Sequence, residues 1–105
     1  MAISKRYLAS LLVGTLAATP VWAADPIKIG VSQPLTGAVA ASGNYVTNGA
    51  RIAAAEINEK GGLLGREVEL IIEDNKSNPR EAVNAAEKLI LSDKVPVIMG
   101  AWSST

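Results

Sequence analysis

The sequence contains neither cysteine nor histidine in its 105 residues. Without them the chain cannot form disulfides, thiolate nucleophiles, zinc sites built from Cys and His, or a Ser-His-Asp triad. Carboxylates and lysines are the groups left for proton transfer. We therefore expect a protein that is not an enzyme, with no catalytic residue, no metal site and no cofactor.

The charge balance and the aromatic content argue against a nucleic-acid-binding surface. Ten Lys and Arg residues balance ten Asp and Glu residues, so the formal net charge is zero, whereas nucleic-acid-binding domains carry a basic excess. The aromatic residues are Tyr7, Trp22, Tyr45 and Trp102, too few for a platform that stacks bases. We expect no nucleic-acid partner.

The glycine-rich motifs of nucleotide-binding enzymes are missing as well. Gly30, Gly37 and Gly43 have the wrong spacing for a GxGxxG dinucleotide motif, and no GxxxxGK[ST] phosphate loop occurs. Glu73 and Asp74 could imitate the acid that binds a ribose, but a solvated strand end is the simpler interpretation. A hydrolase or dehydrogenase of the doubly wound α/β class is therefore the less favoured hypothesis.

The first 23 residues have the pattern of a secretory signal peptide. Lys5 and Arg6 form a positive amino-terminal region, an apolar run too short to span a bilayer comfortably follows, and Val21 and Ala23 are small residues at the positions that a signal peptidase recognises. We expect cleavage after Ala23, with an uncleaved membrane anchor as the alternative. Export of a chain without cysteine is typical of a bacterial periplasm.

Residues 24–105 alternate between strand and helix patterns. In the segment NEKGGLLGREVELIIED, residues 58–74, Gly61 and Gly62 supply left-handed positions that end a helix, and apolar residues then recur with a period of two. The predicted elements are strand Ile27–Ser32, helix Asn44–Lys60, strand Glu67–Glu73, helix Pro79–Ser92 and strand Val95–Gly100. Right-handed crossovers predict an α/β fold with a parallel sheet of strand order 2-1-3 and one helix on each face.

Each predicted helix has an apolar face that we expect to pack on the sheet. The residues predicted to form these faces are Val46, Ala50, Ala53 and Ile57 in the first helix and Val83, Ala86 and Ile90 in the second. The start of the second helix is well marked, because Asn78 can cap it and Pro79 occupies its first position, where a missing N–H leaves no hydrogen bond unmade.

Four segments, taken in order, resemble the amino-terminal lobe of periplasmic branched-chain amino-acid-binding proteins. They are IKIGVSQPLTG, the N-x-x-GG-x-x-GR block at residues 58–66, ELIIEDNKSNP and VIMGAWSST, and together they run from Ile27 to Thr105. The resemblance implies a type I periplasmic binding protein, whose two lobes close over a small ligand. Residues 24–105 are fewer than the ~100 to 150 of a typical domain, so we expect an incomplete amino-terminal lobe with the second lobe absent.

The resemblance also implies a ligand site after the third strand. Ser104 falls at the hydroxyl position of the family, where it and nearby backbone N–H groups would hold a ligand carboxylate at a helix N-terminus, with Thr105 as the neighbouring donor. Ser103 belongs to the same cluster and stands where some members have a cysteine. Trp102 is a candidate wall of the cleft. The alternatives are that residues 103–105 only cap a following helix and that Trp102 only packs.

Two further ligand candidates lie in or after the first loop, residues 33–43. Ser42 aligns with a cleft-lining position that is often aromatic in the family, and its small size would open the pocket or move the contact to Tyr45. The loop itself, with its glycines and proline, is explained more simply as a connection that must turn.

Two classes of function remain after these observations: a solute-binding module and, less favoured, an enzyme of the doubly wound α/β class. The leading hypothesis is an extracytoplasmic solute-binding receptor that carries a branched-chain or other small amino acid to the permease of an ABC importer. Amide- or urea-binding receptors and sensory input domains of the same fold are the alternatives. The ligand stays open, because in this family the second lobe supplies much of the side-chain pocket.

Overall fold

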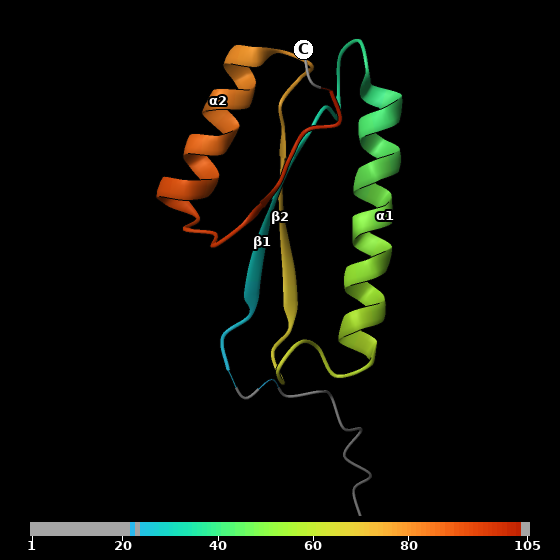
Figure 1. Ribbon diagram of the computed structural model, residues 1–105, viewed down its shortest axis with the longest axis vertical. Coiled ribbons are helices and arrows are strands. Elements are labelled where there is room, and N and C mark those ends of the chain that lie inside the picture. The colour runs from blue at the N-terminus through green and yellow to red at the C-terminus, as the bar shows by residue number, and fades with distance from the viewer. Residues whose placement is uncertain (1–21, 23, 104–105) are drawn as a thin grey trace, which may run out of the picture.

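A computed structural model describes residue 22 and residues 24–103 of the protein. Residues 1–21 and 23 of the predicted signal peptide, and the candidate ligand residues Ser104 and Thr105, lie outside the described part. In chain order the elements are β1 (Ile27–Gln33), α1 (Ala40–Glu59), β2 (Val68–Asp74), α2 (Pro79–Glu87), a π-helical segment η1 (Lys88–Ser92) and β3 (Ile98–Met99) (Figure 1). None of the described helices is both long and apolar enough to cross a membrane.

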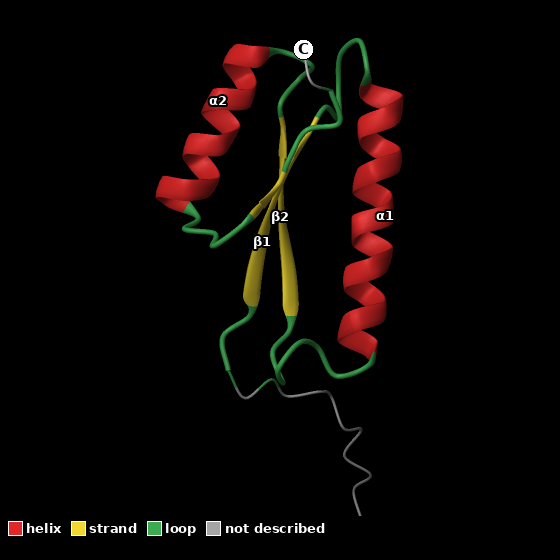
Figure 2. Cartoon of the chain, in the orientation of Figure 1, coloured by secondary structure: helices red, strands yellow, loops and turns green. Residues whose placement is uncertain are grey.

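The strands form a parallel sheet with β1 in the centre. The strand order is β2-β1-β3, as predicted. β1 pairs with β2 along its whole length, from Ile27 opposite Val68 to Gln33 opposite Asp74. Its pairing with β3 is confined to Gly30 with Ile98 and Val31 with Met99. Helices α1 and α2 lie on opposite sides of the strands (Figure 2), so both crossovers have the predicted arrangement.

Helix α1 and strand β3 begin three residues or more from their predicted starts, and the predicted second helix is divided into α2 and η1. Helix α1 begins at Ala40, four positions before the predicted start at Asn44, and it includes Gly43, which the sequence analysis had placed in a loop. Only glycine fits at position 43 of the helix, because a Cβ at this position would overlap the carbonyl group of Pro34. β3 is shorter than predicted and begins at Ile98; the N–H of Val95, the predicted first residue, bonds to the carbonyl of Leu89 in η1, 3.0 Å away.

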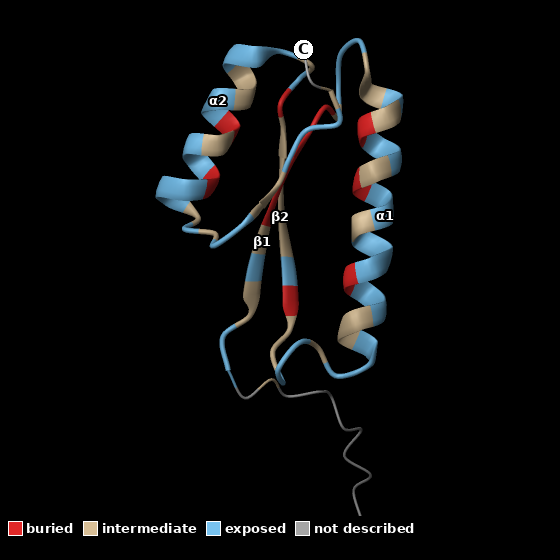
Figure 3. Ribbon diagram, in the orientation of Figure 1, coloured by how far each residue is buried: buried red, intermediate tan, exposed pale blue. Residues whose placement is uncertain are grey.

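The predicted helix faces are wrong by one position at several residues. The buried residues are Gly43, Thr47 and Ala54 in α1, Ala85 in α2 and Leu89 in η1. They face the sheet (Figure 3), whereas Ala53, Val83 and Ile90 are exposed. Thr47 can be buried although it is polar, because its hydroxyl donates a hydrogen bond to the carbonyl of Gly43 at 2.8 Å.

The start of α2 confirms its predicted cap. The side chain of Asn78 accepts hydrogen bonds from the N–H groups of Arg80 (2.9 Å) and Glu81 (3.2 Å), and Pro79 is the first helical residue. These bonds satisfy donors that a helix N-terminus leaves without an intrahelical partner. The cap also fixes where the loop after β2 ends.

The glycine block between α1 and β2 turns the chain at the amino-terminal end of the sheet. Gly61, Gly62 and Gly65 all have positive φ (103°, 78° and 73°), which confirms the left-handed positions predicted for Gly61 and Gly62. Asn58 ties the end of α1 to the start of β2, because its side chain accepts from the N–H of Val68 (2.7 Å) and donates to the carbonyl of the same residue (2.9 Å).

Candidate ligand-binding site

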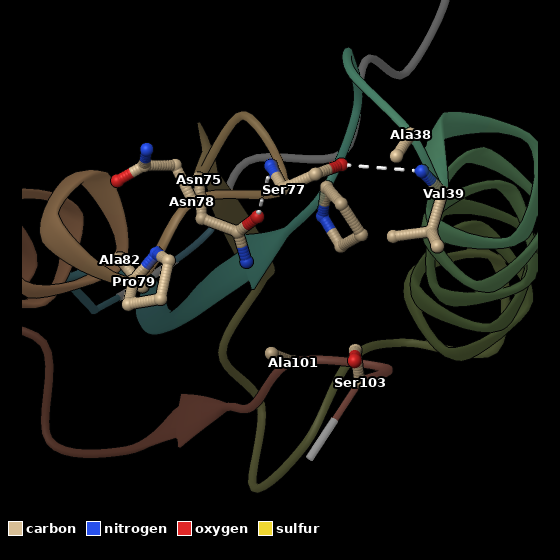
Figure 4. Close-up of a pocket in the computed structure, with 10 residues that line it drawn as sticks. Ala38, Val39, Asn75, Ser77, Asn78, Pro79, Ala82, Ala101 and Ser103 are labelled. Carbon is tan, nitrogen blue, oxygen red and sulfur yellow. Dashed lines mark hydrogen bonds between the residues drawn. The ribbon is translucent and has the colours of Figure 1, made fainter. Parts of the chain in front are cut away.

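A cavity of about 200 Å³ opens at the carboxyl-terminal edge of the sheet. Three segments form it: the loop from β1 into α1, the loop and first turn of α2, and the chain after β3. Its lining residues are Pro34, Ala38, Val39, Asn75, Ser77, Asn78, Pro79, Ala82, Ala101 and Ser103 (Figure 4). This edge is where parallel α/β sheets bind ligands.

The cavity is electrically neutral in its side chains but lies at the amino-terminal ends of both helices. Among the described residues that line it, none carries a charged side chain. Val39 directly precedes α1, and Pro79 is the first residue of α2. Because a helix N-terminus carries partial positive charge and N–H donors, this arrangement suits an anionic group of a small ligand.

Asp74, at the end of β2, anchors the loop that follows β1. Its Oδ1 accepts hydrogen bonds from the N–H groups of Leu35 (2.8 Å), Thr36 (3.2 Å) and Lys76 (2.8 Å), and its Oδ2 accepts from the hydroxyl of Thr36 (2.6 Å). Burial raises the pKa of Asp74, but the hydrogen bond from the Thr36 hydroxyl and those from the three N–H groups outweigh it and hold the pKa below its ordinary value. Asp74 is thus an anchor rather than the solvated strand end favoured from the sequence.

Ser77 joins the same two loops on the cavity side. Its hydroxyl donates to the carbonyl of Thr36 (2.9 Å) and accepts from the N–H of Val39 (3.3 Å) (Figure 4). Gly37 is required opposite it, since φ is +91° there and a Cβ would lie 2.7 Å from the carbonyl oxygen of Lys76. These contacts hold the two loops together. The dense run of Asn, Ser and Lys in residues 74–78 was the sequence signal for such a turn.

Gln33 links the end of β1 to both neighbouring segments. Its side chain donates from Nε2 to the carbonyl of Gly100 and accepts at Oε1 from the N–H of Trp102, 3.0 Å away. Its own carbonyl accepts from the N–H of Asn75 at 3.1 Å. The side chain is buried, with the residue only 1% exposed. This role was not predicted from the sequence, in which Gln33 is the first residue of the predicted connecting loop 33–43.

The candidates predicted from the sequence do not all meet at the cavity. Ser103 lines it and is partly buried. Trp102 is 53% exposed and does not line it. Ser42 and Tyr45 lie within α1 outside the cavity lining, and Tyr45 is 78% exposed.

Comparison with known proteins identifies the family. The periplasmic binding protein family matches residues 26–105. The Leu/Ile/Val-binding protein BraC3 of Rhizobium johnstonii is 44% identical over 97 residues, which are 92% of this chain and 26% of that protein. The chain thus spans about a quarter of the length of this relative.

Solved structures agree with this assignment. The branched-chain amino-acid transporter substrate-binding protein LivJ of Streptococcus pneumoniae, in complex with isoleucine, matches with a TM-score of 0.70 and 37% identity over 71% of this chain and 22% of that one. A solute-binding protein of an ABC transporter from Rhodopseudomonas palustris, in complex with 3,4-dihydroxybenzoic acid, matches with a TM-score of 0.60 and 31% identity over 70% of this chain and 20% of that one. The chain belongs to the periplasmic binding protein family.

Proposed function

We propose that this chain forms part of the amino-terminal lobe of a two-lobed receptor that binds a branched-chain amino acid in the periplasm and delivers it to the permease of an ABC importer. The observation that carries the proposal is the neutral cavity at the carboxyl edge of the sheet, lined by Ser103 and lying between two helix N-termini. It occurs in a chain whose relatives include a Leu/Ile/Val-binding protein.

The chemistry of the cavity supports a ligand with a carboxylate. The isoleucine and the 3,4-dihydroxybenzoic acid bound by the two structural relatives both contain this group. A carboxylate accepts hydrogen bonds from hydroxyl and backbone N–H donors, and a helix N-terminus favours its charge. In this chain the donors would be Ser104 and Thr105, which follow Ser103 directly. The binding role requires no catalysis.

Export is the second part of the proposal. Residues 1–23 would be a signal peptide that is removed, so that the mature protein begins at Ala24. The mass of the intact protein purified from the periplasm tests this directly. A periplasmic protein that still contains residues 1–23 would refute the cleavage.

Calorimetric titration of the full receptor that contains this chain tests the ligand. We expect leucine, isoleucine and valine to bind more tightly than acetamide or urea. Ser104→Ala should weaken isoleucine binding by about ten- to a hundredfold, since a hydrogen bond to a charged group contributes ~1.5 to 3 kcal/mol. Ser92→Ala, the same chemical change at the exposed end of η1, should leave the affinity unchanged.

Each contrary result would change a different part of the proposal. Preferential binding of acetamide or urea would replace the amino-acid proposal with the amide-receptor alternative. An unchanged affinity in Ser104→Ala would show that residues 103–105 cap a helix and do not hold the ligand.

A further inference from the structure

Gln33 uses its side chain to continue the sheet where the backbone pairing stops. β1 and β3 pair through Gly30 with Ile98 and through Val31 with Met99, so the same register would place Gln33 opposite Ala101. In a parallel pair, one residue donates to the carbonyl before its partner and accepts from the N–H after it. The Gln33 amide bonds to the carbonyl of residue 100 and the N–H of residue 102. The side chain therefore takes the place of a backbone bridge to Ala101.

We propose that Gln33 is a positioning residue for the ligand site, because it fixes the backbone that leads into Ser103. This inference rests on the proposed function. Ala101 and Ser103 form one side of the cavity, and Asn75 lies across it from them (Figure 4). The backbone carbonyl of Gln33 bonds to the N–H of Asn75, so this one residue is hydrogen-bonded to both sides of the cavity and sets their separation.

Glutamine is well suited to this place for a physical reason. Its amide offers both a donor and an acceptor without charge, and both are used in a residue that is 1% exposed. The two backbone groups that it bonds belong to exposed residues, Gly100 and Trp102, which β3 does not hold because it ends at Met99. Loss of the amide should therefore free the segment after β3 more than it disturbs the core.

The test compares two side-chain amides at opposite ends of the sheet, each of which bonds both a backbone carbonyl and a backbone N–H of a neighbouring segment. We call each such pair of hydrogen bonds an amide clamp. Gln33→Met removes the clamp at the cavity, and Asn58→Leu removes the matched clamp that bonds both backbone groups of Val68 at the far end. In the full receptor we would measure isoleucine affinity by calorimetry, thermal stability, and hydrogen exchange at the Trp102 amide. Gln33→Glu serves as a second variant of similar shape, which cannot donate to Gly100 when it is ionised.

We expect Gln33→Met to weaken isoleucine binding by about tenfold, the effect of misplacing donors that act on a charged group, and to speed exchange at Trp102. Gln33→Glu should weaken binding in the same direction. Asn58→Leu should lower the melting temperature yet leave affinity and Trp102 exchange unchanged. A purely structural role for Gln33 predicts instead that both clamps affect binding alike.

Two results would overturn the inference. The first is wild-type affinity in Gln33→Met, and the second is an equal loss of affinity in Asn58→Leu. A wild-type receptor that binds no amino acid would refute the proposed function and with it the ligand role of Gln33. The Trp102 exchange rate in the ligand-free protein would still show whether the clamp exists, so the two failures can be told apart.

Discussion

Replacing Gly62 by alanine should destabilise the protein strongly, for two reasons that can be measured separately: a backbone conformation that disfavours side chains, and steric overlap. Gly62 has φ of +78°, and a Cβ at this position would overlap the carbonyl group of Arg66, with the carbonyl carbon at 2.7 Å. The left-handed backbone costs a residue with a side chain ~1 to 2 kcal/mol. Steric overlap in a packed region adds ~1 to 3 kcal/mol.

The carbonyl of Arg66 cannot move away freely. It accepts a hydrogen bond from the N–H of Leu63 at 2.8 Å, and the N–H of Arg66 donates to the carbonyl of Leu63 at the same distance. Relaxing the overlap would strain this bridge. We therefore expect Gly62→Ala to lower the free energy of unfolding by about 2 to 5 kcal/mol in total.

Gly65→Ala is the matched control for this prediction. Gly65 also has a positive φ, +73°, but a Cβ there would meet nothing within 4 Å. Only the backbone penalty of ~1 to 2 kcal/mol should then apply. Urea unfolding of the full receptor, with the slope m compared between variants, measures both values. Equal losses in the two variants would refute the close approach at Gly62. Isoleucine affinity should be unchanged in both, because they lie at the opposite end of the sheet from the cavity.

Three further predictions concern single residues. Gly49→Ala should stabilise the protein by ~0.5 to 1 kcal/mol, because Gly49 is an exposed helical residue whose Cβ would meet nothing within 4 Å; a lower melting temperature would contradict this. Asn78→Ala should cost ~1 kcal/mol through loss of the cap on α2, and an unchanged urea midpoint would count against the capping role. The pKa of Asp74 is lowered in the folded state, so its stabilisation is full above the unfolded pKa of ~3.9 and is lost as pH falls through the lower folded pKa. Asp74→Asn should therefore be less stable than wild type at pH 7, by ~1 to 2 kcal/mol after allowance for solvent screening, and the difference measured by urea unfolding should shrink below about pH 4; a constant difference down to pH 2 would refute the role of its charge.

The strand order could be predicted from the right-handedness of the crossovers, and the cap of α2 and the turn after α1 could be predicted because their signals are local. Asn78 and Pro79 mark a helix start by their own chemistry, and the glycines after α1 mark a turn. The helical position of Gly43 could not be predicted, because the sequence does not reveal the close approach of the Pro34 carbonyl that requires a glycine there. The face of α1 was misplaced for a similar reason, since Thr47 is buried only because its own helix satisfies its hydroxyl.

The edge of the sheet at which the cavity lies was predictable, but the side chains that hold its loops in place were not. The rule that parallel sheets bind ligands at their carboxyl edge pointed to the residues after β3, and Ser103 does line the cavity there. The bonds of Gln33, and those of Asp74 to the loop after β1, follow no local pattern, because their partners lie far along the chain: Gly100 is 67 residues from Gln33, and Leu35 is 39 residues from Asp74. Periodicity describes the face of one element, whereas these side chains act between elements.

The isolated polypeptide of residues 24–105 should be marginally stable and should self-associate. β3 is at the edge of the sheet, and the structure leaves Val83, Ile90, Leu91 and Val97 between 52% and 71% exposed. An open strand edge beside apolar surface is a template for pairing with another chain. Sedimentation velocity across a range of concentrations should therefore detect oligomers, and Val97→Lys, which places a charge beside the edge, should reduce them. A sharp two-state melt from a concentration-independent monomer would contradict this, because the three strands and their helices would then form a sufficient core on their own.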